Sequence, residues 1–146
     1  MNRIMKFFFR IPVYVYALRM GRFFGKQFLL LQHIGRSSNK IRKTVLEVVD
    51  VVDGAPIVIS GFGSKSDWLL NMKKNPSVII QWGDRRFNSF PIWLKADEVT
   101  DILNKYQLKH KFLVLVYEKM FNINLNKKSE YPLCKFPILY SGTSTK

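Results

Sequence analysis

The stretch SGFGSKSDWLLNMKKNP, residues 60–76, sets a turn rich in glycine and serine directly before a short segment with apolar periodicity. Trp68, Leu69 and Met72 recur at the spacing that places side chains on one face of an α-helix. The Asn-Pro pair at the end of the stretch would stop that helix, because proline cannot continue it. We therefore expect one helix here, and the turn in front of it is the first candidate for a binding site.

The turn has the features of an anion-binding device. The residues Ser64 to Asp67 have the form of a capping box, and the start of a helix presents unpaired backbone N–H groups and a positive dipole end. Lys65 adds a full charge beside them. The nucleotide P-loop is excluded because Ser64 separates Gly63 from Lys65, and the dinucleotide fingerprint because Ser66 replaces its third glycine. A plain strand-to-helix turn with a solvated lysine is the alternative.

A second basic turn, HIGRSSNKIRKT, spans residues 33–44 between two expected strands. Its serines are Ser37 and Ser38, and its cations are Arg36, Lys40, Arg42 and Lys43. Asn39 stands where a left-handed backbone would suit the reversal of the chain. Two basic turns in one small chain indicate a single anion site.

Short β-branched and aromatic runs predict a mainly β, α+β fold. These runs are QFLLLQHI (27–34), TVLEVVDVV (44–52), PIVIS (56–60), SVIIQW (77–82), RRFNSFPIWL (85–94) and FPILYSG (136–142). Gly83-Asp84 lies between two of them in the manner of a hairpin turn, and residues 95–121 predict a second helical region. We expect a meandering antiparallel sheet that forms a small barrel with inserted helices, in a single domain over residues 1–146.

Charge is concentrated at the start of the chain. The 146 residues carry a formal net charge of +14, and ten basic residues precede the first acidic one, Glu47. Residues 1–26 mix these cations with Phe, Val, Tyr and Leu, which predicts an amphipathic N-terminal helix. It would contact an anionic membrane surface peripherally, pack on the protein's own core, or both. Its longest uncharged run, Ile11 to Leu18, is far below the roughly 20 residues that a membrane span requires.

Other classes of function fit the composition poorly. The chain has one cysteine, Cys134, and two histidines, His33 and His110, so we expect neither an internal disulfide nor a metal site. The basic residues lie among apolar ones rather than in a strand motif with stacking aromatics, so nucleic acid is not an expected partner.

Two segments, FLLLQHIGRSSNKIRKTVLEVV and VISGFGSKSDWLLNMKKNPSVIIQWGDRRF, carry a family resemblance. They resemble the deazaflavin-dependent nitroreductases, small split β-barrel oxidoreductases with a Gly-Arg-x-Ser-Gly turn, a Ser-Gly-rich turn, and Trp-x-x-Asn and Asn-Pro before the next strand. The likeness runs from about Phe24 to Phe87. It implies a split β-barrel of about six antiparallel strands that binds coenzyme F-420, with FMN as the alternative cofactor.

The resemblance also implies roles for individual residues. The cofactor's phosphate and acidic tail would contact Arg36, Ser37, Ser38, Arg42 and Lys65, and its ring system would lie along Ser60, Gly61 and Gly63. Thr44 is expected to face the pocket, whereas Glu47 either faces it or lies on a solvated strand face. Trp68 is a candidate contact, although Trp68 and Asn71 would equally fasten the helix to the core. Ser60 and His110 are the candidates for orienting or protonating the substrate, and each also has an ordinary structural alternative.

The function implied is hydride transfer from a deazaflavin or flavin to a lipophilic acceptor, such as a quinone or nitro compound, at the membrane surface. The alternative is a non-catalytic carrier of a flavin-like or lipophilic ligand in the same barrel. The N-terminal segment is similar to that of members on the cytoplasmic membrane, so we expect a cytoplasmic protein held peripherally on its inner face. A homodimer is compatible with these expectations.

Overall fold

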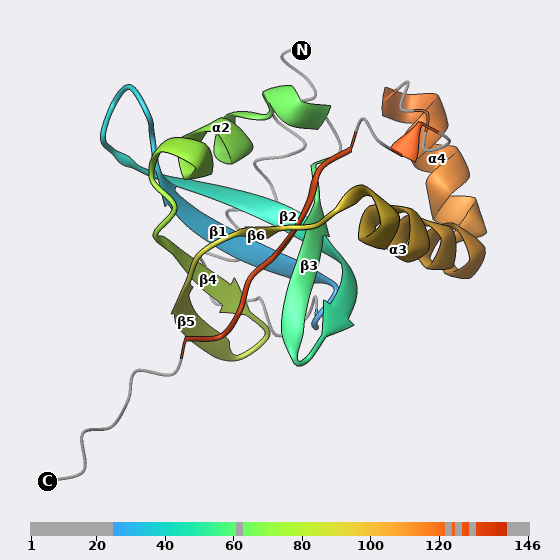
Figure 1. The fold of residues 1–146 in the computed structure, drawn as a ribbon, viewed down its shortest axis with the longest axis horizontal. Helices are drawn as coiled ribbons and strands as arrows, with labels where there is room; N and C mark the ends of the chain where they lie inside the picture. Colours follow the sequence, from blue (N-terminus) through green and yellow to red (C-terminus); the bar gives the residue numbers. More distant parts are fainter. Residues whose placement is uncertain (1–24, 61–62, 122–123, 125–126, 129–130, 140–146) are drawn as a thin grey trace, which may run out of the picture.

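The computed structural model describes residues 25–60, 63–121, 124, 127–128 and 131–139, and within them one antiparallel sheet of seven strands (Figure 1). The strands are β1 (Phe28–Ile34), β2 (Ile41–Val52), β3 (Ala55–Ile59), β4 (Val78–Trp82), β5 (Arg85–Ser89), β6 (Ile92–Trp93) and β7 (Leu133–Lys135). Their order across the sheet is β5-β4-β1-β2-β3-β7-β6. The helical elements are a 3-10 turn (Gly63–Lys65), α2 (Asp67–Lys74), α3 (Ala96–Lys109) and α4 (Lys111–Phe121).

The sheet curls into a half-barrel. Its two edge strands, β5 and β6, are separated in the chain only by Phe90 and Pro91, so the sheet must bend to bring its edges together. This architecture confirms the predicted α+β split barrel, with one strand more than the expected six.

The core lies on the concave face, where the strands supply every second residue. Leu29 and Leu31 of β1 and Ile80 of β4 are fully buried there, as the period of two in an extended strand requires. Helix α2 packs against the same cluster through Trp68 and Met72. The predicted apolar stripe of this helix is therefore confirmed, and it fastens α2 over one end of the half-barrel (Figure 1).

Three tight turns depend on backbone conformations with positive φ. Asp53 (φ 53°) and Gly54 (φ 74°) join β2 to β3 in the manner of a type I′ turn, and Gly83 (φ 60°) begins the predicted two-residue hairpin between β4 and β5. Asn39 has φ 53°, which confirms the left-handed residue predicted in the basic turn.

Two strand predictions were wrong at proline residues. The closing strand is β7 rather than residues 136–142: the N–H of Phe136 bonds to the carbonyl of Pro56 as the strand ends, and Pro137 has no N–H to extend the ladder. Residues 140–142 lie outside the described part of the chain. The run RRFNSFPIWL forms two strands rather than one, because the chain leaves β5 before Pro91 and enters β6 after it.

The order of strands and helices also differs from the prediction in part. Only β1, β2 and β3 form a meander, because the connection through α2 carries the chain across the sheet and β4 pairs with β1. The expected helical region over 95–121 is two helices with a break at His110. Residues 1–24 of the predicted N-terminal helix lie outside the described residues. Of the helices that the structure describes, none has the length and apolar character needed to cross a bilayer.

Candidate cofactor site

The first basic turn is a compact loop closed by its own backbone. Gly35 N–H donates to the carbonyl of Lys40 at 2.9 Å, and Asn39 N–H donates to the carbonyl of Gly35 at 2.9 Å. The Ser38 hydroxyl accepts from Lys40 N–H and from Arg42 Nη2, both at 3.4 Å. Ser38 lies close against the backbone, since a Cβ at Gly35 would meet its Oγ at 2.5 Å. The turn thus presents Ser38 and Arg42 together at the surface, with Ser37 exposed beside them.

Arg36 fastens this turn to helix α2. Its backbone N–H and its Nη1 both donate to Asn71 Oδ1, at 3.0 and 2.9 Å, and its Nη2 pairs with Asp67 Oδ1 at 3.0 Å. Lys74 Nζ in turn donates to the carbonyl of Arg36 at 2.7 Å. The Arg36 guanidinium therefore already has partners within the protein, and its position holds the turn against α2.

A buried histidine continues this network into the barrel. Asn71 Nδ2 donates to His33 Nδ1 at 3.1 Å, because Asn71 Oδ1 is occupied by Arg36. His33 therefore carries its proton on Nε2, which lies 3.3 Å from Thr44 Oγ1. Burial, together with the positive charge of Arg42 and against the opposing effect of Asp67, lowers the pKa of His33 to about 4. The ring is a neutral link between β1, β2 and α2.

The glycine-rich turn is fixed by two serine hydroxyls. Ser60 is fully buried, and its Oγ donates to the carbonyl of Gly63 and lies against Ser66 Oγ, both at 2.6 Å. The predicted capping box over Ser64 to Asp67 is wrong, because α2 begins at Asp67 with Ser66 as its N-cap, and Ser66 makes no side-chain capping bond. Its hydroxyl faces Ser60 instead of the first turn of the helix. Lys65 is exposed just before the helix, and Gly61 lies outside the described residues.

The first basic turn lies along α2, since the backbone of Arg36 contacts Asn71 and Lys74 in the last turn of the helix while its guanidinium reaches back to the first. Arg36 of the first turn pairs with Asp67, the first residue of the helix, and Lys65 of the second turn lies two residues earlier. Trp68, by contrast, points into the core, which favours its structural role over contact with a ligand.

His110 and Glu47 belong to a different part of the fold. The ring of His110 lies 4.9 Å from that of Tyr106, whose hydroxyl donates to Glu47 Oε1 at 2.6 Å. These residues join the end of α3 to β2. Thr44 and Glu47 are three residues apart on β2, so they face opposite sides of the sheet, and only Thr44 meets His33.

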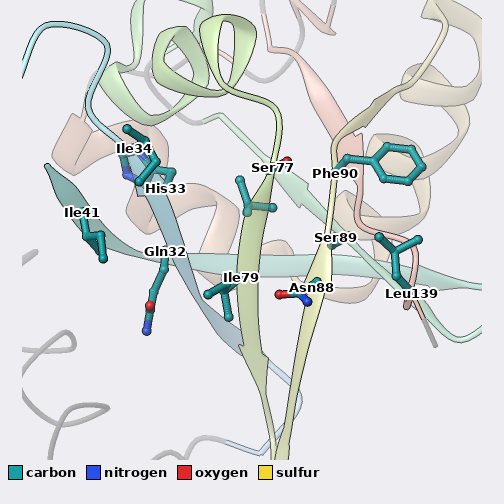
Figure 2. Close-up of a pocket in the computed structure, with 11 residues that line it drawn as sticks. Gln32, His33, Ile34, Ile41, Ser77, Ile79, Asn88, Ser89, Phe90 and Leu139 are labelled. Carbon is teal, nitrogen blue, oxygen red and sulfur yellow. The ribbon is translucent and has the colours of Figure 1, made fainter. Parts of the chain in front are cut away.

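An apolar hollow of about 530 Å³ lies beside the first basic turn, on the outer side of β1, β4 and β5 (Figure 2). Its lining includes Ile34, Ile41, Ile79, Phe90 and Leu139, with the amides of Gln32 and Asn88 among them. Ile34 and Ile41 flank the basic turn in the sequence, and Phe90 and Leu139 lie on the other side of β4. The volume is in the range of small-molecule sites.

Sequence reasoning missed His33 and Asp67 as members of this network. His33 was considered only as a metal ligand, and Asp67 only as part of the capping box. Both act through contacts between residues more than 30 positions apart, for which the local sequence holds no signal.

Comparisons with known proteins place the chain in context. The family model described as F420H(2)-dependent quinone reductase matches residues 10–111. A search of curated proteins found no match. A solved F420-H2 dependent reductase is similar over 77% of this chain and 96% of its own, with 20% identity and a TM-score of 0.55.

Two further solved structures share the fold. A protein of unknown function from Agrobacterium tumefaciens matches over 84% of this chain with 14% identity and a TM-score of 0.56, and this chain spans 54% of its length. The heme storage protein HutZ from Vibrio cholerae matches over 86% of this chain and 89% of its own, with 11% identity and a TM-score of 0.55. At such low identities these likenesses concern the fold alone.

Proposed function

Because the chain belongs to the F420H(2)-dependent quinone reductase family, we propose that it transfers a hydride from reduced coenzyme F-420 to a lipophilic acceptor, such as a quinone or a nitro compound. One observation supports this most directly. The basic turn of residues 35–40 is fastened to α2 through Arg36, whose guanidinium reaches Asp67 at the start of the helix, and Lys65 is exposed two residues before Asp67. This arrangement suits an acidic cofactor.

The donor set fits a phosphate and carboxylates. Ser38 and Arg42 are exposed side by side, and hydroxyl and guanidinium groups form strong hydrogen bonds to anionic oxygens. Asp67, at the start of α2, is paired with Arg36 and does not repel an anion as a free carboxylate would. We propose coenzyme F-420 rather than FMN because several cations surround the turn, and F-420 offers carboxylates as well as a phosphate.

The protein's own residues have three tasks in this reaction. When bound, the reduced coenzyme supplies the hydride. Arg42, Ser38 and Lys65 would hold its anionic part, while Arg36 keeps their turn in place on α2. Ser60 holds the glycine turn along which the ring system would lie. Ser60 and His110 are the predicted groups for protonating the acceptor. Ser60 would have to release the carbonyl of Gly63 to do so, and His110 lies in a different part of the fold, against Tyr106.

The acceptor would approach from the apolar hollow. This hollow begins at the foot of the basic turn, and its exposed isoleucine, phenylalanine and leucine side chains offer an apolar surface that a lipophilic acceptor would cover and remove from water. We further propose that the protein acts on the inner surface of the cell membrane, where a lipophilic acceptor is dissolved and where the basic N-terminal segment would bind anionic lipids.

Binding of the cofactor tests the site. We expect coenzyme F-420 to bind more tightly than riboflavin in a fluorescence titration, and Arg42→Ala to weaken it by about 1.5–3 kcal/mol, the range of a charge-assisted hydrogen bond. High salt should shrink the difference. Arg85→Ala, which removes an exposed arginine from the β4–β5 hairpin, is the matched control and should bind as the parent does. Equal affinity for riboflavin and F-420 would remove the proposed role of the cations.

A turnover measurement distinguishes an enzyme from a non-catalytic carrier. Mixing the protein with reduced F-420 and a water-soluble quinone should oxidise the coenzyme, which is followed by its absorbance. Tight binding without turnover for any quinone or nitro compound would favour the non-catalytic carrier.

A further inference from the structure

The corner where α3 meets α4 exposes three large apolar side chains. Leu108 is in the last turn of α3, and Phe112 and Leu115 are in the first turns of α4; their exposed fractions are 72%, 80% and 63%. Single exposed apolar residues are common on protein surfaces, but three within eight residues form a patch. In Figure 1 these helices form one lateral end of the molecule, beside β3.

The patch is separate from the faces by which these helices pack on the barrel. Helix α3 buries Val99, Ile102 and Leu103 against β-strand residues, and Val114 of α4 is buried in a cluster with Tyr106. Among the described side chains, the core contacts of both helices are thus made by other residues. Leu108, Phe112 and Leu115 remain exposed beside these buried positions.

Exposed lysines flank the three apolar residues along both helices. These lysines are Lys105, Lys109, Lys111 and Lys119. The acidic residues of α3 lie toward its other end, at Asp97, Glu98 and Asp101, and the only acidic residue of α4 is the half-buried Glu118. The corner therefore combines an apolar centre with a positive rim.

We propose that this corner, which we call the α3–α4 docking corner, inserts into the surface of an anionic bilayer. Leu108, Phe112 and Leu115 enter the boundary between headgroups and acyl chains, and the lysines lie at the level of the lipid phosphates. A second copy of this chain fits less well, because a symmetric contact would bring the lysines of one copy against those of the other. The inference rests on the proposed function for its membrane setting, and on described residues for the surface itself.

Vesicle binding tests the docking corner. The full chain is mixed with vesicles of phosphatidylcholine and phosphatidylglycerol, and the bound fraction is measured by flotation. Replacing Leu108, Phe112 and Leu115 together by Ser should lower the partition coefficient by about tenfold or more. The matched control replaces Val51 and Val52, two exposed valines at the end of β2, by Ser. This variant should partition as the parent does. An unchanged partition coefficient for the triple variant would overturn the proposal.

A charge-matched pair of variants separates local from overall charge. Lys109→Gln with Lys111→Gln and Lys73→Gln with Arg85→Gln lower the net charge equally, and all four side chains are exposed. The first pair should lose several-fold more binding than the second. Equal losses would mean that the whole charge, and not this corner, attracts the lipid.

Direct insertion can be seen with a fluorophore on a new cysteine. Phe112→Cys is labelled with an environment-sensitive dye; the native Cys134 is fully buried and its thiol pKa is raised by burial, so it stays unlabelled in the folded protein. Brominated lipids should quench the dye at 112 and leave the dye at a Val51→Cys control unquenched. Equal quenching at both positions would contradict insertion of the corner.

The reductase proposal and the docking proposal fail separately. Hydride transfer to a water-soluble quinone is measured without lipid, so its absence would remove the reductase function and leave the flotation result standing. If the triple variant loses a dimer in light scattering and the parent ignores anionic vesicles, the corner is a contact between copies and the lipid proposal falls.

Discussion

His33 shows how much a single residue contributes to this site. It joins Asn71 to Thr44, and through Asn71 it reaches Arg36 and Asp67 at the surface. The ring must be neutral to accept the bond from Asn71, because an imidazolium has no acceptor nitrogen. Protonation of His33 would therefore remove the hydrogen bond from Asn71 Nδ2, because the Nδ1–H of His33 and the N–H of Asn71 would then be two donors pointing at each other.

This gives a pH dependence of stability with a defined sign. The pKa of His33 is about 4 when folded, below the value of about 6.5 expected unfolded, so the unfolded state binds more protons between them. Stability should fall as the pH drops from 6.5 toward 4, with a contribution from His33 on the order of 2 kcal/mol. In urea unfolding at pH 7 and pH 4.5, His33→Gln should show a smaller loss, since glutamine can donate and accept but does not titrate. The same loss in parent and variant would argue against a neutral, buried His33.

The conformation of a single residue was predictable where it depends only on its neighbours in the sequence. The left-handed Asn39 follows from its place in a polar turn between strands, and the structure has it there. His33 and Asn71 were not predictable as partners, since they are 38 positions apart and meet only when α2 packs over β1.

The basic turn is the element on which the site depends. A glycine at position 35 leaves room for the Ser38 hydroxyl, which a side chain there would displace, and that hydroxyl accepts a hydrogen bond from Arg42. Periodicity predicted most of the strands around it, because alternation of buried and exposed residues is a local property. The pairing of β4 with β1 was missed, because the choice of neighbour depends on how α2 crosses the sheet.

Gly35→Ala should weaken F-420 binding several-fold while changing the melting temperature little, because the Ser38 side chain can move aside but then no longer supports Arg42. Gly54→Ala is the matched contrast. Its φ is +74° with open space around it, so an alanine there meets only backbone strain of about 1 kcal/mol, and it should lower stability without affecting the cofactor. Titration and thermal unfolding of both variants check this. Unchanged F-420 binding in Gly35→Ala would mean that anion binding does not depend on the geometry of the turn.

At the scale of the whole molecule, the sequence was sufficient for the family and the split barrel, because the two motif segments occur in the order and spacing of the family and its model matches residues 10–111. The network around His33 needed the assembled fold. The net charge of +14 is a molecular property too, and it favours association with anionic surfaces at low salt.

Removal of residues 1–23 should weaken binding to acidic vesicles while the barrel still holds its cofactor, because the cations of that segment each contribute about 1 kcal/mol near an anionic surface. The docking corner should leave a residual, salt-sensitive affinity in the shortened protein. Flotation measures the loss of vesicle binding, and F-420 titration of the same preparation shows whether the barrel still binds its cofactor. A shortened protein that unfolds would instead place the segment in the core.

The position of β7 has a consequence for the making of the protein. It lies between β3 and β6 in the sheet, although it is the last strand of the described residues in chain order. On the ribosome, β6 therefore has no neighbour, and the edge of β3 stays open, until residues 133–135 have emerged. An open edge invites pairing with other chains. Newly made copies are thus most prone to aggregate in the interval before β7 joins the sheet, when a chaperone that shields strand edges would matter most.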